Sequence, residues 1–432
     1  MRVSTPDPHT RGDAKRSDPG EGALYACCAL KARGATPQKV KKRMLTHMAN
    51  PSTEDADPST LMGRWGFLRE SMDVQAFHDV CKAAFDAAPE DPEIGAQYGE
   101  ALGFIGRHKD KQTLLRRLLE THPKSVILNT NLGIELLAQG RYREGWPHFA
   151  YRIGKQNTLR KTDPLDPKHR WRGEPLQGKR LVLVSEQGLG DTLQFARYAI
   201  DIHNQGARSF LNVHPPLRPL LSRSPALGTV LTSDIKVEIH HWIPMMELVP
   251  VFSHTAADIP WPGAYVSPPA DDRPFPRLGG ADGVRVGLVW QGNPKFRLNF
   301  ARSMGLDDLV TLRDATNCQF FSLMAGEAAR DLAASAQSGW IKDLSKVTTP
   351  FERLASAVAA VDVVVTVCTS IAHLAGAMGK PTFLMLSALP DWRWGREGRT
   401  TAWYPSMRLY RQKRFGDWSD IVRDVARDLS AF

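Results

Sequence analysis

The chain has 432 residues, of which 42% are hydrophobic and 24% charged, as in an ordinary globular protein of two or three domains. No apolar run reaches the roughly 18–20 residues that cross a bilayer, and the first thirty residues are polar, so we expect a cytoplasmic protein without a transmembrane segment. The net charge of +10 is concentrated in residues 1–50, which hold ten Lys and Arg against four Asp and Glu. Because the rest is nearly balanced, we do not expect nucleic acid as a partner.

Residues 1–58 contain Pro, Gly, Ser and Lys without a sustained hydrophobic period, which predicts a disordered basic tail. Met44 and Met48 lie near its end, so an alternative is that residues 1–47 are not part of the native protein. The sequence has no C-x-x-C pair, and its one D-x-D motif, Asp55-Ala56-Asp57, lies in this tail rather than after a strand. We therefore expect no metal and no cofactor.

From residue 59 the pattern becomes helical and repeats every 34 residues. The matching positions are Pro89, Gly99, Leu102, Gly106 and Arg107, which recur as Pro123, Gly133, Leu136, Gly140 and Arg141. This period is typical of tetratricopeptide repeats, whose helix pairs bury their apolar faces by stacking. We expect such a module over residues 59–153, able to hold a protein partner; two unrelated amphipathic helix pairs are the alternative.

A different pattern begins after a charged, proline-containing linker at residues 154–178. Residues 180–185 form a short, nearly continuous apolar run, as expected of a strand buried on both faces. A helical pattern then extends to Gln205, followed by a strand candidate at 209–213 and a helix opened by Pro215. Strands and helices that alternate at this spacing predict a parallel, doubly wound domain over residues 179–270.

The alternation restarts after a break rich in Pro and Gly near residue 270, and covers residues 283–415. Strand candidates are 284–289, 319–324, 361–367 and 381–386, and helical patterns include 351–360 and 371–378. A last helix candidate, 418–429, lies in the C-terminal segment 416–432. The predicted fold class is therefore α/β, with two Rossmann-like domains preceded by an all-α, tetratricopeptide-like module.

The first candidate site directly follows the strand at 180–185. Parallel α/β sheets bind ligands beyond the carboxyl ends of their strands, beside helix N-termini. Gly188 and Gly190 permit a tight turn and close approach of the backbone to a phosphate. Asp191 could cap the following helix or act as a general base, and the spacing leaves both roles open.

The second candidate site follows the strand at 361–367. Cys368, Thr369 and Ser370 precede a helix of small residues, and hydroxyls beside free amides suit a diphosphate. His373 lies on the face that could reach the same ligand, or it packs on the sheet.

A basic loop after the strand at 284–289 adds a third set of candidates. Asn293, Lys295, Arg302 and Ser303 lie there, and its cations could neutralise a leaving phosphate. A solvated basic loop is the alternative.

Several segments together resemble the heptosyltransferase-like glycosyltransferases of family 9, a bacterial type with members that carry tetratricopeptide repeats at the N-terminus. The resemblance covers about residues 125–430 and rests on residues 186–191, 369–376 and 390–394, supported by 403–409 and 416–418. It implies a GT-B fold and inverting, metal-independent transfer from a nucleotide-sugar to a glycan or protein acceptor. Asp191 would take the proton from the acceptor hydroxyl. Thr369 and Ser370 would hold the diphosphate, with His373 nearby and Arg302 and Ser303 as a clamp.

The chain departs from this family at the second site and in the basic loop. Cys368 stands where relatives usually have Asp, and Phe296 and Asn299 stand where they often have His and Asp. Losing an acid could change donor choice, weaken binding, or mark a fold whose catalysis has decayed. An enzyme is favoured because Asp191 and the phosphate-binding candidates are retained. A sugar-nucleotide-binding scaffold is the main alternative, and a sugar-nucleotide epimerase is a second.

Overall fold

The computed structural model describes residues 58–155, 166–231, 238–261, 263–269, 278 and 283–432. The basic tail, with Cys27, Cys28 and the Asp55-Ala56-Asp57 motif, lies outside these residues. The chain divides into two compact units, residues 1–71 and 72–432, and in the first the structure describes helix α3 (Pro58–Ser71). In the described segments, no helix combines the length and apolar character that a bilayer-spanning helix needs.

The second unit begins with antiparallel helix pairs. Asp73, Asp91 and Ser125 each cap the helix that follows, by accepting a hydrogen bond from a backbone amide of its first turn. The helices are α4 (Val74–Ala87), α5 (Pro92–Phe104), α6 (His108–Thr121), α7 (Val126–Ala138), α8 (Tyr142–Phe149) and α9 (Arg152–Lys155).

The predicted 34-residue period has a structural basis in these pairs. Helices α5 and α7 begin 34 residues apart, and so do α6 and α8. Gly106 and Gly140 adopt φ values of 78° and 75°, a left-handed conformation that favours glycine and ends the first helix of each pair. At the following residue, the amides of Arg107 and Arg141 donate to the carbonyls of Leu102 and Leu136.

The first α/β half contains a four-stranded parallel sheet in the order β3-β2-β1-β4. Strand β1 is central, and its Leu183 pairs with Leu211 on one side and Ile243 on the other. The elements are η2 (Pro167–His169), β1 (Arg180–Val184), α10 (Leu189–Phe195), α11 (Tyr198–Asn204), β2 (Arg208–Asn212), η3 (Pro215–Leu217), α12 (Arg218–Leu221), η4 (Pro225–Leu227), β3 (Thr229–Val230), β4 (His241–Pro244), η5 (Met245–Leu248), α13 (Val249–Phe252) and η6 (Ala256–Asp258).

The second half contains a six-stranded parallel sheet in the order β10-β9-β8-β5-β6-β7. Its central strands β5 and β8 carry the apolar runs identified in the sequence, and every residue of β8 is buried. The elements are β5 (Val284–Val289), α14 (Asn299–Arg302), η7 (Asp307–Asp314), β6 (Cys318–Ser322), α15 (Glu327–Ala334), η8 (Ala336–Gly339), β7 (Ile341–Asp343), α16 (Phe351–Ala360), β8 (Val363–Val367), α17 (Ser370–Ala377), β9 (Thr382–Leu386), η9 (Trp392–Trp394), β10 (Met407–Arg411) and α18 (Ser419–Ser430).

The predicted α/β class is confirmed, although the first half also contains two strands, β3 and β4, that were not predicted, and differs in one helix. The helical pattern that extended to Gln205 is split into α10 and α11 at Ala196 and Arg197. Arg197 is fully buried there, and its guanidinium donates to the carbonyls of Pro260 and Trp403 and to the Tyr265 hydroxyl. The side chain therefore ties this break to two distant segments.

A buried carboxylate, Glu135, joins the helix pairs to the second α/β half. Its side chain is fully buried on α7 and forms ion pairs with Arg396 at 2.6 Å and with Lys111 at 3.8 Å. Burial alone would raise the pKa of Glu135, but His108, Lys111 and Arg396 together lower it to about 2. Since Arg396 directly follows η9, the helices and this half share one charged contact.

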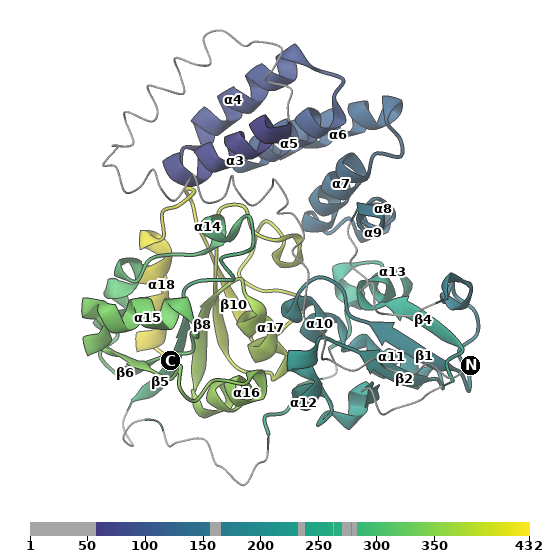
Figure 1. Cartoon of the computed structure of the whole chain (residues 1–432). Helices are drawn as coiled ribbons and strands as arrows, with labels where there is room; N and C mark the ends of the chain where they lie inside the picture. Colours follow the sequence, from purple (N-terminus) through teal and green to yellow (C-terminus); the bar gives the residue numbers. More distant parts are fainter. Residues whose placement is uncertain (1–57, 156–165, 232–237, 262, 270–277, 279–282) are drawn as a thin grey trace, which may run out of the picture. The chain divides into compact units, whose positions relative to one another are not determined.

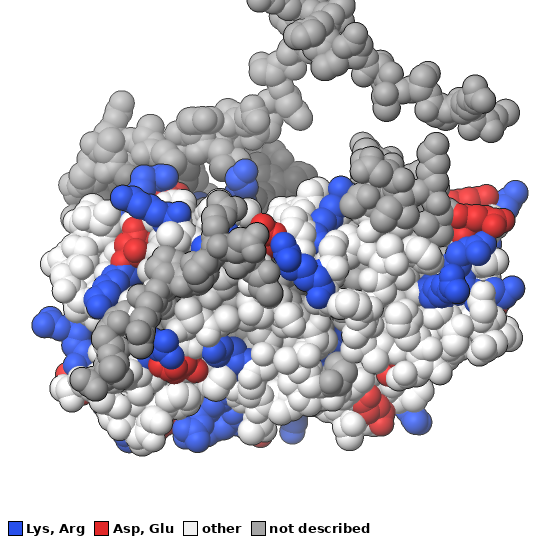
Figure 2. Space-filling model, turned by 90° about the horizontal axis from the view of Figure 1, so that it is seen from below, with Lys and Arg blue, Asp and Glu red and all other residues white. Residues whose placement is uncertain are grey.

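On the face shown in Figure 2, the uncovered Lys and Arg side chains lie in several small groups, with Asp and Glu among them. This is the distribution expected from the nearly balanced charge of residues 51–432.

Candidate functional site

The strand order of the second sheet brings two of the three candidate sites to the same edge. In that sheet the chain first adds β6 and β7 on one side of β5. It then crosses to the other side of β5, where β8 is the neighbouring strand. Ligands of open parallel sheets bind beyond the carboxyl ends of the strands at such a switch point. Cys368 and Thr369 directly follow β8, and the loop with Asn293, Arg302 and Ser303 follows β5. The second and third candidate sites therefore share one sheet edge.

From the sequence we expected the glycines of the turn after β1 to adopt its unusual backbone conformation, but another residue does so. Gln187 adopts the left-handed conformation, with φ of 54°, whereas Gly188 is extended. The amide of Gly188 donates to Asp191 Oδ2 at 2.8 Å, so Asp191 does cap helix α10. Asp191 thus has the structural role that the sequence left open, which does not exclude a chemical one.

Gly190 is required for close packing between the two α/β halves. Helix α10 lies beside α17 of the second half (Figure 1). A Cβ atom at Gly190 would lie 2.7 Å from His373 Cδ2 and 3.4 Å from Ser370 Cα. The glycine therefore admits a helix of the other half, and its approach to a phosphate stays a prediction.

Arg393 fixes the position of Asp191 across this junction. It forms an ion pair with Asp191 and donates to both oxygens of Asp391, at 2.9 and 3.1 Å, and to Gln194 Oε1 at 2.7 Å. Burial would lower the pKa of Arg393, but Asp391 and Asp191 outweigh it and raise this pKa. The guanidinium is therefore a permanent cation within the junction.

His373 is buried at the same junction, with 6% of its surface exposed. Its ring stacks on Trp394 at 5.3 Å between centroids, and Nδ1 lies 3.1 Å from the Tyr404 hydroxyl. Burial lowers the pKa of His373 well below its usual value, and the charges of Arg393, Arg197 and Arg302 lower it further. The imidazole is thus neutral at physiological pH.

Cys368 also faces this group of aromatic and cationic side chains. Its Sγ accepts a hydrogen bond from Trp394 Nε1 at 3.1 Å. Burial and the nearby Asp391 raise the pKa of the thiol, so it is uncharged. Next to it, Thr369 Oγ1 accepts the Ile371 amide at 3.2 Å and caps α17, while Ser370 begins the helix and is half-buried.

The basic loop holds Arg302 through the two residues that depart from the family pattern. Arg302 Nε donates to Asn299 Oδ1 at 3.3 Å, and its guanidinium lies 4.5 Å from the centre of the Phe296 ring. Ser303 Oγ accepts the Gly292 amide at 3.1 Å, which closes the loop.

The other two candidates of this loop are on its outer side. Asn293 Oδ1 accepts the Lys295 amide, and Lys295 is exposed. Of the loop cations, Arg302 is the one that influences the pKa of both Cys368 and His373, so it lies close to the second candidate site.

Three arginines therefore lie near the neutral His373, and two of them, Arg302 and Arg393, also lie near the neutral Cys368. Arg302 was predicted from the sequence; Arg197 and Arg393 were not. Arg393 belongs to a segment whose likeness to the family was noted, but nothing in its spacing predicted an ion pair with Asp191. Of the three, Arg302 is half-buried and has no carboxylate partner among the described residues, so it is the guanidinium suited to an anionic ligand such as a diphosphate.

Within the described residues, no group of three or more His, Cys, Asp or Glu side chains could hold a metal ion. Among the described cysteines, Cys318 and Cys368 are free thiols.

No protein-family model matches the chain. In sequence, the chain is similar to the protein FlbA of Caulobacter vibrioides, with 28% identity over 328 residues, which are 69% of this chain and 54% of that protein. The chain thus spans about half the length of this curated relative.

Two solved glycosyltransferase structures resemble part of the chain. The E. coli ADP-heptose heptosyltransferase II has 15% identity and a TM-score of 0.41, over 59% of this chain and 98% of that one. A family 9 glycosyl transferase from Veillonella parvula has 9% identity and a TM-score of 0.41, over 60% and 98%. Because both scores are below 0.5, the function of the site has to be argued from its own residues.

Proposed function

We propose that this chain is an inverting glycosyltransferase of the heptosyltransferase-like, GT-B type, which moves a sugar from a nucleotide-sugar to a glycan or protein acceptor without a metal ion. The observation that carries the proposal is the junction of α10 and α17. There a carboxylate, Asp191, from the first half meets the strand ends, the helix start and the arginines of the second half. A base and an anion site on opposite halves are what such a transfer needs.

The second half would bind the donor. The amides at the start of α17, the hydroxyls of Thr369 and Ser370, and the Arg302 guanidinium offer donors and positive charge to the diphosphate. As the bond between the anomeric carbon and the phosphate oxygen breaks, its electron pair goes to the leaving nucleoside diphosphate. Arg302 and the helix start would stabilise the charge that develops there.

Asp191 would take the proton from the acceptor hydroxyl while the hydroxyl oxygen forms its bond to the anomeric carbon. A carboxylate has about four acceptor positions, of which the Gly188 amide and Arg393 use two. The side chain is 18% exposed, so a hydroxyl can reach it. Attack from the face opposite the nucleotide inverts the anomeric carbon. Arg393 would act as a positioning residue that holds the carboxylate in line.

The helix pairs would serve as a tetratricopeptide-like module beside these halves. Their 34-residue spacing and the equivalent left-handed glycines Gly106 and Gly140 support this assignment. A protein partner or protein acceptor held by stacked helix pairs is compatible with this arrangement.

The first test is ligand-induced thermal stabilisation by a panel of ADP-, GDP-, UDP- and CMP-sugars. A ligand at about 100 times its dissociation constant stabilises the fold by about 2.7 kcal/mol, which shifts the melting temperature measurably. We expect one nucleotide class to shift the wild type and the exposed-arginine control Arg330→Ala, but not Arg302→Ala. The same shift in the presence of EDTA is expected for a metal-free site. No shift with any donor would contradict the proposal.

A sugar-nucleotide-binding scaffold without turnover is the second candidate. It is favoured by Cys368, whose uncharged thiol pairs with Trp394 where relatives usually have an acid. The two functions differ in the product: a scaffold binds the donor but releases no nucleoside diphosphate with any acceptor. If Cys368→Asp gains turnover that the wild type lacks, the scaffold assignment is correct.

A further inference from the structure

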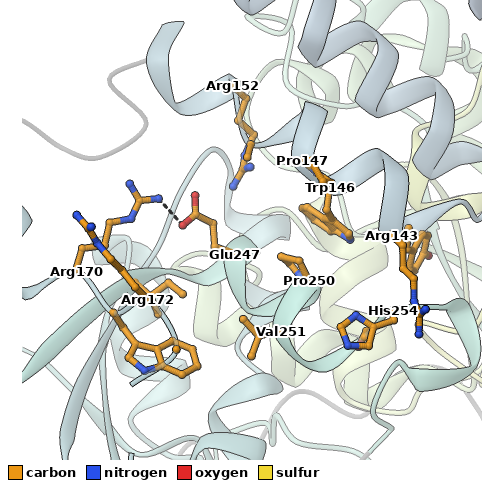
Figure 3. A pocket seen from close by; sticks show the side chains of 16 residues that line it. Arg143, Trp146, Pro147, Arg152, Arg170, Arg172, Glu247, Pro250, Val251 and His254 are labelled. Atoms are coloured by element: carbon orange, nitrogen blue, oxygen red, sulfur yellow. Dashed lines mark hydrogen bonds and ion pairs between the residues drawn. The ribbon is translucent and has the colours of Figure 1, made fainter. Parts of the chain in front are cut away.

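A cavity lies away from the junction, between helix α8 and the first α/β half (Figure 3). Its volume is about 650 Å³, within the range of small-molecule pockets. Helix α8 contributes Trp146 and Pro147, and α13 contributes Pro250 and Val251 on the facing side. None of the residues proposed to bind the donor lines this cavity.

The wall of the cavity is strongly cationic. Arg143, Arg152, Arg170 and Arg172 line it, against one carboxylate, Glu247. Arg170 forms an ion pair with Glu247, shown by the dashed line in Figure 3. Arg152 forms an ion pair with Glu186 behind the wall, at 2.8 Å. Arg143 and Arg172 are exposed, and neither forms a side-chain ion pair with any residue that the structure describes.

Two buried donors of the wall are also without a partner. Trp146 Nε1 and Arg152 Nε make no hydrogen bond within the described residues, although their side chains are only 3% and 4% exposed. Buried N–H groups are nearly always paired in folded proteins. Because each of these two atoms is itself closed to solvent, neither faces the open space of the cavity, and a ligand there would be held by the exposed arginines instead.

The remaining wall is flat and apolar. Val251 is 42% exposed although it is a hydrophobic residue, and Pro250 lies beside it, whereas Trp146 and Trp171 are buried behind the wall. Rings stack on such surfaces, while arginine forks bind carboxylate or phosphate oxygens in pairs. The combination suits a compact molecule with one ring face and one acidic group.

We propose that this cavity is a binding site for a small acidic sugar, which lays its ring against Pro250 and Val251 and presents its carboxylate or phosphate to the arginines of the wall. The proposal does not depend on the transferase assignment, because the site shares no residue with the junction. The proposed site is formed by helix α8 together with the first α/β half, so the helix pairs would take part in ligand binding.

Isothermal titration with D-glucuronate, glucose 1-phosphate and neutral glucose tests the proposal and distinguishes a carboxylate from a phosphate ligand. We expect at least one of the two acids to bind with a dissociation constant of roughly 1 mM or below, and glucose at least tenfold more weakly. The Arg143→Ala/Arg172→Ala double variant should weaken that binding at least tenfold. Both side chains are exposed, so the variant should melt like the wild type.

Two single-arginine controls locate the binding. Arg330→Ala should bind like the wild type, which excludes a general effect of lost charge. Arg302→Ala should also retain the acid, because Arg302 belongs to the junction and not to this cavity. Loss of binding in Arg302→Ala but not in the double variant would assign the ligand to the junction and overturn the proposal. Equal binding of glucose, or no binding of either acid up to roughly 10 mM, would overturn it too.

Discussion

Arg393 and Asp191 form an ion pair across the junction of the two α/β halves, although 202 positions separate them in sequence. Asp191 belongs to the first turn of α10 and Arg393 to η9, so the carboxylate is oriented from both sides of the junction. Any movement of one half relative to the other changes the surroundings of Asp191. The proposed base is therefore competent only when the halves are held together.

Asp191→Asn tests whether this carboxylate does chemistry in addition to capping. The amide oxygen can still accept the Gly188 amide, but it is not basic. We expect transfer to fall by about 10²–10⁴-fold, as for loss of a general base, while donor-induced thermal stabilisation remains. Initial rates of nucleoside diphosphate release measure the effect.

The matched control is Asp391→Asn, which removes the other carboxylate from Arg393 and leaves Asp191 in place. Its rate should fall by less than about tenfold if Asp191 is the base. Equal losses in the two variants would show that Asp191 acts only by pairing with Arg393.

Gly190→Ala should destabilise the protein by about 1–3 kcal/mol, because the new methyl group would overpack the contact with His373. The imidazole has no room to retreat, since it stacks on Trp394 and contacts Tyr404. Urea unfolding measures the loss. Gly339→Ala is the control, since no heavy atom lies within 4 Å of its added Cβ, and it should change the unfolding free energy by less than about 0.5 kcal/mol.

His373 should make stability depend on pH below about 6.5, its ordinary pKa in the unfolded chain. In the folded protein burial and three arginines lower this pKa, so the unfolded state binds the additional proton. Stability is therefore unaffected above that pH and is lost as the pH falls below it. Between pH 7.5 and 5.5 the wild type should lose about 1.4 kcal/mol more than His373→Gln in urea unfolding. Parallel pH profiles of the two proteins would contradict a neutral, buried His373.

Glu135→Gln should lower the unfolding free energy by about 3 kcal/mol, because it leaves buried Lys111 and Arg396 with less compensating charge. Glu144→Gln removes a carboxylate that is 37% exposed and should cost no more than about 1 kcal/mol. The pKa of Glu135 is lowered from 4.5 to about 2, so its contribution is complete above the first value. That contribution should disappear as the pH falls through about 2. Denaturant unfolding at pH 7 and pH 3 measures both effects.

The order of strands and helices was largely predictable, because β1, β5, β8 and β9 are buried on both faces and read as continuous apolar runs. Strands β3, β4 and β7 were missed because two to four residues are too few to show a period. The split between α10 and α11 was also missed. At this split lies Arg197, which donates to carbonyls more than sixty positions later, and such contacts leave no local sequence signal.

The sequence predicted which candidate residues follow the ends of strands. It predicted only in part which of them contact one another. Asp191, Thr369 and Arg302 lie in the segments that follow β1, β8 and β5, so the rule for parallel sheets predicted that they lie at the carboxyl ends of the strands. The packing of Gly190 against His373 of the other half was not predicted, because it depends on a segment far away in the sequence. The partnership of Arg393 with Asp191 depends on how the halves meet, which local spacing does not encode.

The position of β5 at the centre of its sheet has a consequence during synthesis. Its Leu288 pairs with Ser322 of β6 and with Val365 of β8, so one neighbour follows soon and the other much later. At about 5–20 residues per second, a ribosome needs roughly 4–15 s to pass from the end of β5 to the start of β8. Throughout that interval the future centre of the sheet is an apolar edge that can pair with another nascent chain. Slowing translation between residues 290 and 362 should therefore increase aggregation of this protein, before any folded property has changed.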